Sequence, residues 1–150
     1  MDWTGVYEDF REGWVTFFHQ LRFALDRHKG QLRRTFYLSG TSRAWVGDTR
    51  HSLGLGDILA KAAGCGYAAQ TAIGELSGYV WHKTHFQVGL TVAEWGNGLL
   101  VVTDKGAAPG QPQHSGSVLA TTYGLGGDEF VRLQERWKAW WSANYSAPVG

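Results

Sequence analysis

Few residues of this sequence have the types and spacing that metal binding or nucleophilic catalysis needs. His82 and His85 lie close together, but a spacing of three residues puts two side chains on opposite faces of a strand, so we expect no metal site there. Cys65 is the only cysteine, and no base accompanies it nearby in the sequence. Because a nucleophile needs a positioned base, Cys65 is predicted to be a small, buried or partly buried thiol, and no metal or other cofactor is expected.

The acidic residues form no paired-carboxylate motif. Glu94 is the acid of most interest, because its neighbour Trp95 could raise the pKa of the carboxyl group by desolvation. A solvated glutamate at a strand end is the simpler interpretation. If the protein is an enzyme, Glu94, His82 and His85 are the candidates for its polar catalytic group.

Tryptophan gives the strongest signal. The chain has 8 tryptophans, and Trp137, Trp140 and Trp141 fall within five residues of one predicted helix. Three indole rings at that spacing occupy more than one narrow helix face. We therefore expect some indole surface to line a cavity, to meet the first helix or to meet a partner.

The elements that must position these residues begin with a helix over residues 7–28. Its large apolar residues recur at steps of three and four, which is the period of one helix face, and Gly30 suits its end. They are Phe10, Trp14, Phe17, Phe18, Leu21 and Leu25.

The rest of the chain reads as an antiparallel sheet followed by a second long helix. Glycine-rich turns are expected at Gly40, Gly74-Glu75 and Gly96-Asn97-Gly98, and Asp128 is expected to cap the last helix. Alternation of apolar and polar residues over 86–92 predicts a half-buried strand. The predicted strands are 34–39, 67–73, 76–83, 86–92, 99–104 and 116–123, with short helices within 41–53 and 58–63, a loop over 107–116, and a last helix reaching Tyr145.

Length and composition bound the fold and the function. A chain of 150 residues with net charge +1 is predicted to form one domain over 1–150, with 1–30 as an extra N-terminal helix. The near-neutral charge argues against a nucleic-acid partner, and no apolar run is long enough to span a membrane. The absence of a leader-like segment and the single cysteine favour a cytoplasmic protein. We predict an α+β fold in which long N- and C-terminal helices cover an antiparallel sheet of five or six strands.

Two segments resemble a known family. Arg11-Glu12-Gly13-Trp14 with the helix that follows, and Thr121-Thr122-Tyr123-Gly124-Leu125 with Gln134–Trp141, resemble the START-like superfamily (SRPBCC), in its branch similar to the activator of heat-shock-protein-90 ATPase. That resemblance implies a helix-grip fold, in which a strand, two short helices and a curved sheet precede one closing helix. Here a closing-type helix comes first, which suggests a shortened or fragmentary member with an incomplete grip.

The resemblance also implies a function. Members of the superfamily bind apolar small molecules between the sheet and the closing helix, so we expect an apolar or aromatic ligand there. Alternatives are a cyclase or hydrolase acting on a polyketide-like substrate, and a co-chaperone-like interaction module. The expected cavity walls are Tyr79, Trp81, Phe86, Val88 and Leu90 from the sheet and Phe130, Trp137 and Trp141 from the last helix.

The apolar face of the first helix predicts a partner surface. Its six large apolar side chains would each lose about 1.5–3 kcal/mol if left in water. They either fold onto the chain's own sheet or meet a second copy, and we favour a two-fold homodimer through Phe10, Trp14, Phe17, Phe18 and Leu21.

Overall fold

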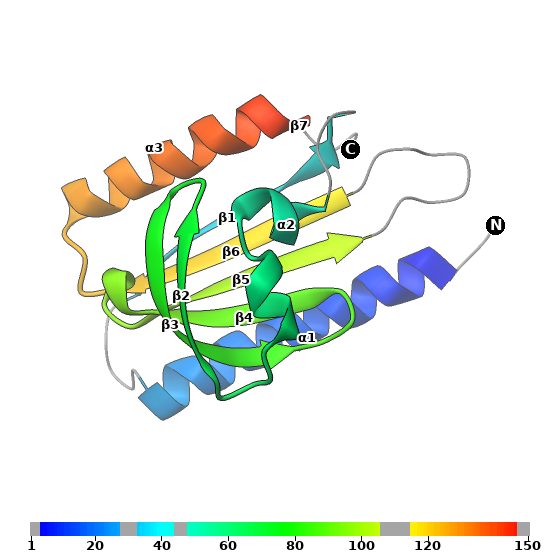
Figure 1. The fold of residues 1–150 in the computed structure, drawn as a ribbon, viewed down its shortest axis with the longest axis horizontal. Helices are drawn as coiled ribbons and strands as arrows, with labels where there is room; N and C mark the ends of the chain where they lie inside the picture. The colour runs from blue at the N-terminus through cyan, green and yellow to red at the C-terminus, as the bar shows by residue number, and fades with distance from the viewer. Residues whose placement is uncertain (1–3, 28–32, 44–47, 106–114, 147–150) are drawn as a thin grey trace. The chain divides into compact units, whose positions relative to one another are not determined.

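The computed structural model describes residues 4–27, 33–43, 48–105 and 115–146 of the chain (Figure 1). The chain divides into two compact units, Met1–Gln31 and Leu32–Gly150. The described residues of the first unit form one long helix, and those of the second form the sheet and the remaining helices.

The first unit is helix α1, Thr4–Arg27, which confirms the predicted helix and begins it three residues earlier. Trp14, Phe17, Phe18, Leu21 and Leu25 lie along α1. The side chain of Phe10 lies outside the described residues.

The second unit is built on one antiparallel sheet with the strand order β2-β3-β4-β5-β6-β1-β7. This confirms the predicted α+β class and antiparallel sheet. The sheet has seven strands because Tyr145–Ser146, directly after the last helix, pairs with Thr41 and Ser42. The strands are β1 Arg33–Ser42, β2 Gly66–Thr71, β3 Gly74–Lys83, β4 Gln87–Val92, β5 Gly98–Lys105, β6 Ser115–Tyr123 and β7 Tyr145–Ser146.

Gly40 does not end the first strand as predicted. It pairs with Gly116 near the end of the β1–β6 ladder, and β1 continues beyond it to Ser42. A Cβ atom at Gly40 would collide with the carbonyl oxygen of Ser146, so glycine here permits the close approach of β7.

The β2–β3 turn is also displaced from its predicted place. Thr71 pairs with Gly74, so the two turn residues are Ala72 and Ile73, and Gly74 begins β3. Gly74 has φ +124, a conformation that favours glycine.

The short helices are α2 Thr49–Leu53 and the 3₁₀ helices η1 Gly56–Ala60 and η2 Ala93–Trp95. The long C-terminal helix is α3, Gly127–Asn144, and its N-cap is Gly126. Asp128 therefore lies inside the first turn, where its charge suits the helix dipole, and is not the cap that we predicted. Most of the predicted 107–116 loop lies outside the described residues.

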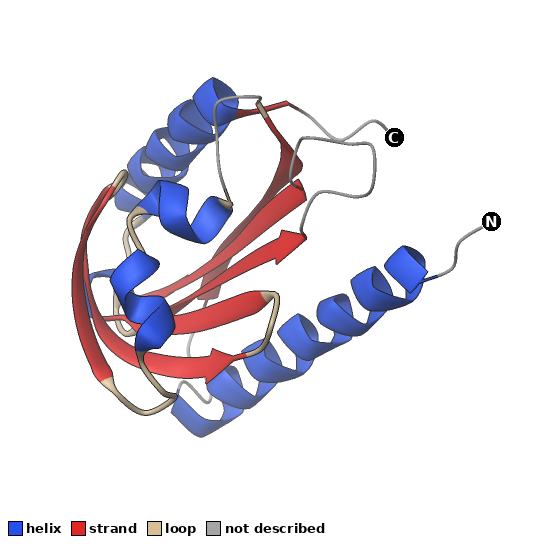
Figure 2. Cartoon of the chain, turned by 45° about the vertical axis from the view of Figure 1, so that its right-hand side comes forward, coloured by secondary structure: helices blue, strands red, loops and turns tan. Residues whose placement is uncertain are grey.

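The order of elements is helix-grip-like. From β1 to α3 the elements are a strand, two short helices, three strands, the short 3₁₀ helix η2, two further strands and the closing helix. The sheet bends so that β2 and β3 curve toward the side on which α3 lies (Figure 2).

The core lies on that side of the sheet. It joins residues of β4, β5 and β6 to α3, and Leu53, Leu55 and Ile58 complete it from the α2–η1 segment. β4 is buried at all six positions and not only at alternate ones. Its polar positions bond residues of β3 and β2. Gln87 hydrogen-bonds His82, the hydroxyl of Thr91 accepts from the backbone N–H of Tyr79, and the carbonyl oxygen of Thr91 accepts from the hydroxyl of Tyr67.

Candidate functional site

Aromatic rings fill the middle of the space between α3 and the sheet. Trp137 is fully buried, with its ring centroid 6.1 Å from that of Phe36 and 6.3 Å from that of Trp95. Trp141 stacks on Tyr145 with centroids 4.0 Å apart and donates its indole N–H to the carbonyl oxygen of Ser39 at 3.2 Å. Any ligand space under α3 must therefore lie toward one end of the helix.

The indole nitrogen of Trp137 has an unusual environment. It is buried, and no residue in the described part of the chain accepts a hydrogen bond from it. A buried donor left without an acceptor costs about 1–3 kcal/mol. The aromatic cluster thus contains one polar atom that a bound molecule or water would satisfy.

A pocket of about 370 Å³ opens at the beginning of α3. We call it the α3 pocket. It lies between the β2–β3 turn, η2 and the first half of α3. Its apolar residues form a floor, and its charged residues form a rim. The floor is Ile73, Leu76, Trp95, Leu125 and Leu133, and the charged lining residues are Glu75, Glu94, Glu129, Arg132 and Arg136.

Two local features position the walls of the pocket. Arg136 donates a hydrogen bond from its guanidinium to the carbonyl oxygen of Ile73 at 3.2 Å, which ties the β2–β3 turn to α3. On the other side, Gly96 ends η2 with φ +66, and a Cβ atom there would collide with the carbonyl oxygen of Tyr123. Glycine therefore lets η2 approach the end of β6 and holds Trp95 in the pocket floor.

Glu94 lies on the rim as an ionised carboxylate. It accepts hydrogen bonds from the backbone N–H of Ser77 at 3.0 Å and from the Ser77 hydroxyl at 2.7 Å. Burial acts to raise the pKa of Glu94, but hydrogen bonds from Ser77 and from its own backbone outweigh burial, so the pKa lies below its ordinary value. The rise that Trp95 could cause is therefore not found. At neutral pH Glu94 is a charge and not a proton donor.

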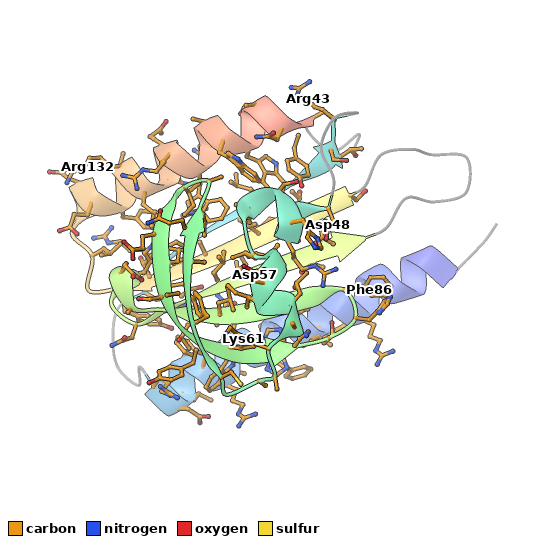
Figure 3. All side chains as sticks on the ribbon, in the orientation of Figure 1. Arg43, Asp48, Asp57, Lys61, Phe86 and Arg132 are labelled. Atoms are coloured by element: carbon orange, nitrogen blue, oxygen red, sulfur yellow. The ribbon has the colours of Figure 1, made fainter. Side chains whose placement is uncertain are left out.

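Arg132 supplies an available positive charge on the same rim. It projects from the first half of α3 (Figure 3) and forms no ion pair with any described residue. Because the rim carries carboxylates and guanidinium groups together, polar substituents of either sign would find a partner there.

The predicted wall residues fall into two groups. Val88, Leu90, Trp137 and Trp141 lie in one buried core, and Phe130 packs against it. The other three lie outside that core. Tyr79 is 58% exposed, and Trp81 and Phe86 are half-buried.

None of the eight predicted residues lines the α3 pocket. Phe86 and Arg132 lie at opposite ends of the strands (Figure 3). Sequence analysis named Trp95 only as a neighbour of Glu94 and missed the other floor residues. The Gly96-Asn97-Gly98 turn signal was the available clue, because the chain reverses directly after Trp95 and η2 ends there.

The three candidates for acid–base chemistry lie apart. Glu94 lines the α3 pocket. His82 is buried on β3, with its Nε2 atom 2.7 Å from Oε1 of Gln87, and His85 is exposed with its ring against Phe86. The described residues therefore bring no acid–base pair together from these three.

Asp104 is a buried acid outside the pocket, and its contacts give it a structural role. It is 4% exposed and accepts hydrogen bonds from the backbone N–H groups of Thr49 at 2.6 Å and Arg50 at 3.2 Å. The Arg50 side chain also donates to Asp104 at 2.8 Å. These contacts fix the start of α2 to the end of β5. Thr49 in turn hydrogen-bonds the hydroxyl of Tyr145 at 2.5 Å, and burial raises the pKa of that hydroxyl to about 12.

Cys65 is exposed, contrary to the buried or partly buried thiol that we predicted. The backbone explains this, because the carbonyl of Cys65 accepts the N–H of Val80 and so fixes the residue at the sheet edge. Within the described ranges, no three His, Cys, Asp or Glu side chains are grouped to hold a metal ion. No helix among the described residues is long and apolar enough to cross a membrane.

Comparison of the chain with family models, curated proteins and solved structures finds no match. The fold and the α3 pocket are therefore the basis for assigning a function.

Proposed function

We propose that the protein binds a small apolar or aromatic molecule in the α3 pocket. The observation that carries this proposal is the floor of five apolar side chains beneath a charged rim. Pockets that bind small molecules typically enclose about 300–1,000 Å³ and combine apolar walls with a few polar groups that set orientation. A volume of about 370 Å³ suits a ligand of one or two fused rings.

The floor and rim give such a ligand a defined orientation. Its ring system packs on Trp95 and Leu133, and its polar substituents point to the rim, within reach of Arg132 or a carboxylate. The Trp95 ring also contacts Trp137, edge to face.

The enzyme alternative has weaker support. A general acid working near neutral pH needs a raised pKa, whereas the pKa of Glu94 is lowered. We therefore propose binding without chemistry. The proposed compartment is the cytoplasm, because a single exposed thiol suits a reducing environment.

A titration with 2-naphthol, a neutral two-ring aromatic, tests the proposal by calorimetry. We expect binding at micromolar concentration, which corresponds to about 8 kcal/mol. Leu125→Trp replaces a partly buried side chain of the pocket floor with a bulky indole ring, which should fill the pocket and abolish binding. Val131→Trp is the matched control, because Val131 is 52% exposed on α3 and does not line the pocket. Equal binding of 2-naphthol by both variants would refute the proposal. So would an unaltered protein that binds neither 2-naphthol nor related one- and two-ring aromatics.

A further inference from the structure

The charged residues on the rim of the α3 pocket are not equivalent. Glu75, Glu94 and Glu129 are acids, and Arg132 and Arg136 are bases. A count of charges alone favours a cationic ligand. The surroundings of each group give the opposite preference, because they differ in how far the protein itself already compensates each charge.

Two of the acids are compensated by the protein. Glu94 accepts hydrogen bonds from the backbone N–H of Ser77 at 3.0 Å and from the Ser77 hydroxyl at 2.7 Å. Glu129 lies in the first turn of α3, where the positive end of the helix dipole offsets its charge. A cationic ligand group would have to compete with these interactions for either carboxylate.

Glu75 borders the pocket from a different direction than the floor does. It precedes Leu76 on β3, and successive side chains of a strand lie on opposite faces. Leu76 is a buried floor residue, whereas Glu75 is exposed. A ring that packs on Leu76 is therefore on the face of β3 opposite to the Glu75 side chain.

The two arginines both line the pocket from α3. Arg136 follows Arg132 by four residues, which is about one helical turn, and the floor residue Leu133 lies between them in sequence. Neither arginine forms an ion pair with any described residue. Like charges at this spacing repel each other, and an anionic group bound between them would remove that repulsion.

Arg136 is held in position before a ligand arrives. Its guanidinium donates a hydrogen bond to the carbonyl oxygen of Ile73 at 3.2 Å, which leaves most of its N–H donors for a ligand. A guanidinium group is planar and pairs with a carboxylate through two parallel hydrogen bonds. Because Arg136 is already oriented, binding an anion to it costs little side-chain entropy.

We propose that the ligand of the α3 pocket is an organic acid, whose carboxylate binds Arg132 and Arg136 while its aromatic or apolar body packs on the floor. This inference rests on the proposed function and narrows its ligand class. Such a molecule meets apolar side chains at one end and two guanidinium groups at the other.

Calorimetric titration with three naphthalene derivatives tests the sign of the ligand charge. At neutral pH 2-naphthoate is an anion, 2-naphthol is neutral and 2-(aminomethyl)naphthalene is a cation, and all three share one ring system. We expect 2-naphthoate to bind about tenfold more tightly than 2-naphthol, and the cation to bind more weakly than both. The advantage of 2-naphthoate should decrease at high salt, because exposed charges are screened.

Two variants of α3 locate the charge that the ligand meets. Arg132→Gln removes one positive charge and should reduce the preference for 2-naphthoate over 2-naphthol to below about threefold. Lys138→Gln is the matched control, because Lys138 is an exposed cation of α3 that does not line the pocket. It should leave the preference unchanged. Both residues are exposed, so we expect both variants to fold, and circular dichroism checks this.

The inference and the proposed function fail in different ways. If 2-naphthol binds and 2-naphthoate binds no more tightly, the pocket accepts neutral rings and the organic acid is overturned. Tighter binding of the cation would also overturn it, as would an equal loss of preference in Arg132→Gln and Lys138→Gln. If none of the three compounds binds, the proposed function is refuted and this inference fails with it.

Discussion

At the scale of single residues, hydrogen bonding determines the charge state of the pocket acid more than its aromatic neighbour does. Glu94 stands beside Trp95 in sequence, which suggested a raised pKa, yet two hydrogen bonds from Ser77 keep the carboxylate ionised. Ser77 lies 17 positions earlier, on β3, so only the folded sheet reveals it. The carboxylate therefore belongs to the charged rim of the α3 pocket.

Removing the Ser77 hydroxyl should raise the pKa of Glu94 toward its ordinary 4.5. Because the folded pKa is lowered, Glu94 contributes stability above pH 4.5 that is lost as the pH falls through the folded pKa. Ser77→Ala should thus cost about 0.5 kcal/mol at neutral pH, and the difference should vanish in acid. Urea unfolding across this pH range and an NMR titration of the carboxyl group measure both effects. An unchanged pKa of Glu94 in Ser77→Ala would contradict this interpretation. So would an equal loss of unfolding free energy in the control Ser115→Ala, which changes an exposed serine at the start of β6.

At the scale of elements, α3 acts as a structural lid over the middle of the sheet and as a pocket wall at its beginning. Trp137 packs between Phe36 and Trp95 with no exposed surface, whereas Leu133, one turn earlier, reaches the pocket floor. The same helix face thus has two roles that depend on position along the helix.

Trp137→Ala should lower the free energy of unfolding by about 3–5 kcal/mol, the usual cost of removing a fully buried aromatic ring. Trp137→Phe should cost less, because it also removes a buried N–H that lacks an acceptor. Val131→Ala on the exposed side of α3 should change stability by no more than about 0.5 kcal/mol. Denaturant unfolding gives all three values, and a loss below about 1 kcal/mol for Trp137→Ala would indicate loose packing under α3.

Sequence periodicity predicted the long helices and most strands because each pattern is local. The apolar steps of α1 and the turn signal after Trp95 are read directly from neighbouring residues. Gly40 was misread as a strand end because its role depends on Ser146, more than a hundred residues away. The pocket floor escaped prediction for the same reason, since Leu76 and Leu133 meet only when the sheet bends toward α3.

At the scale of the whole molecule, the proposed binding site lies within one of the two units. All residues that line the α3 pocket belong to the unit Leu32–Gly150. The order of elements from β1 to α3 is helix-grip-like, and the pocket lies where the closing helix begins. Leu125→Trp should therefore abolish 2-naphthol binding, whereas Val131→Trp should retain it.

The most direct test is an NMR titration of the ¹⁵N-labelled protein with 2-naphthol. Trp95 and Trp137 each give an indole N–H signal that reports on the pocket floor and on the cluster behind it. We predict saturable shifts of both signals, together with the backbone signals of Ile73, Leu125 and Leu133. Pocket signals that stay unchanged up to saturating 2-naphthol, while signals elsewhere shift, would contradict ligand binding in the α3 pocket.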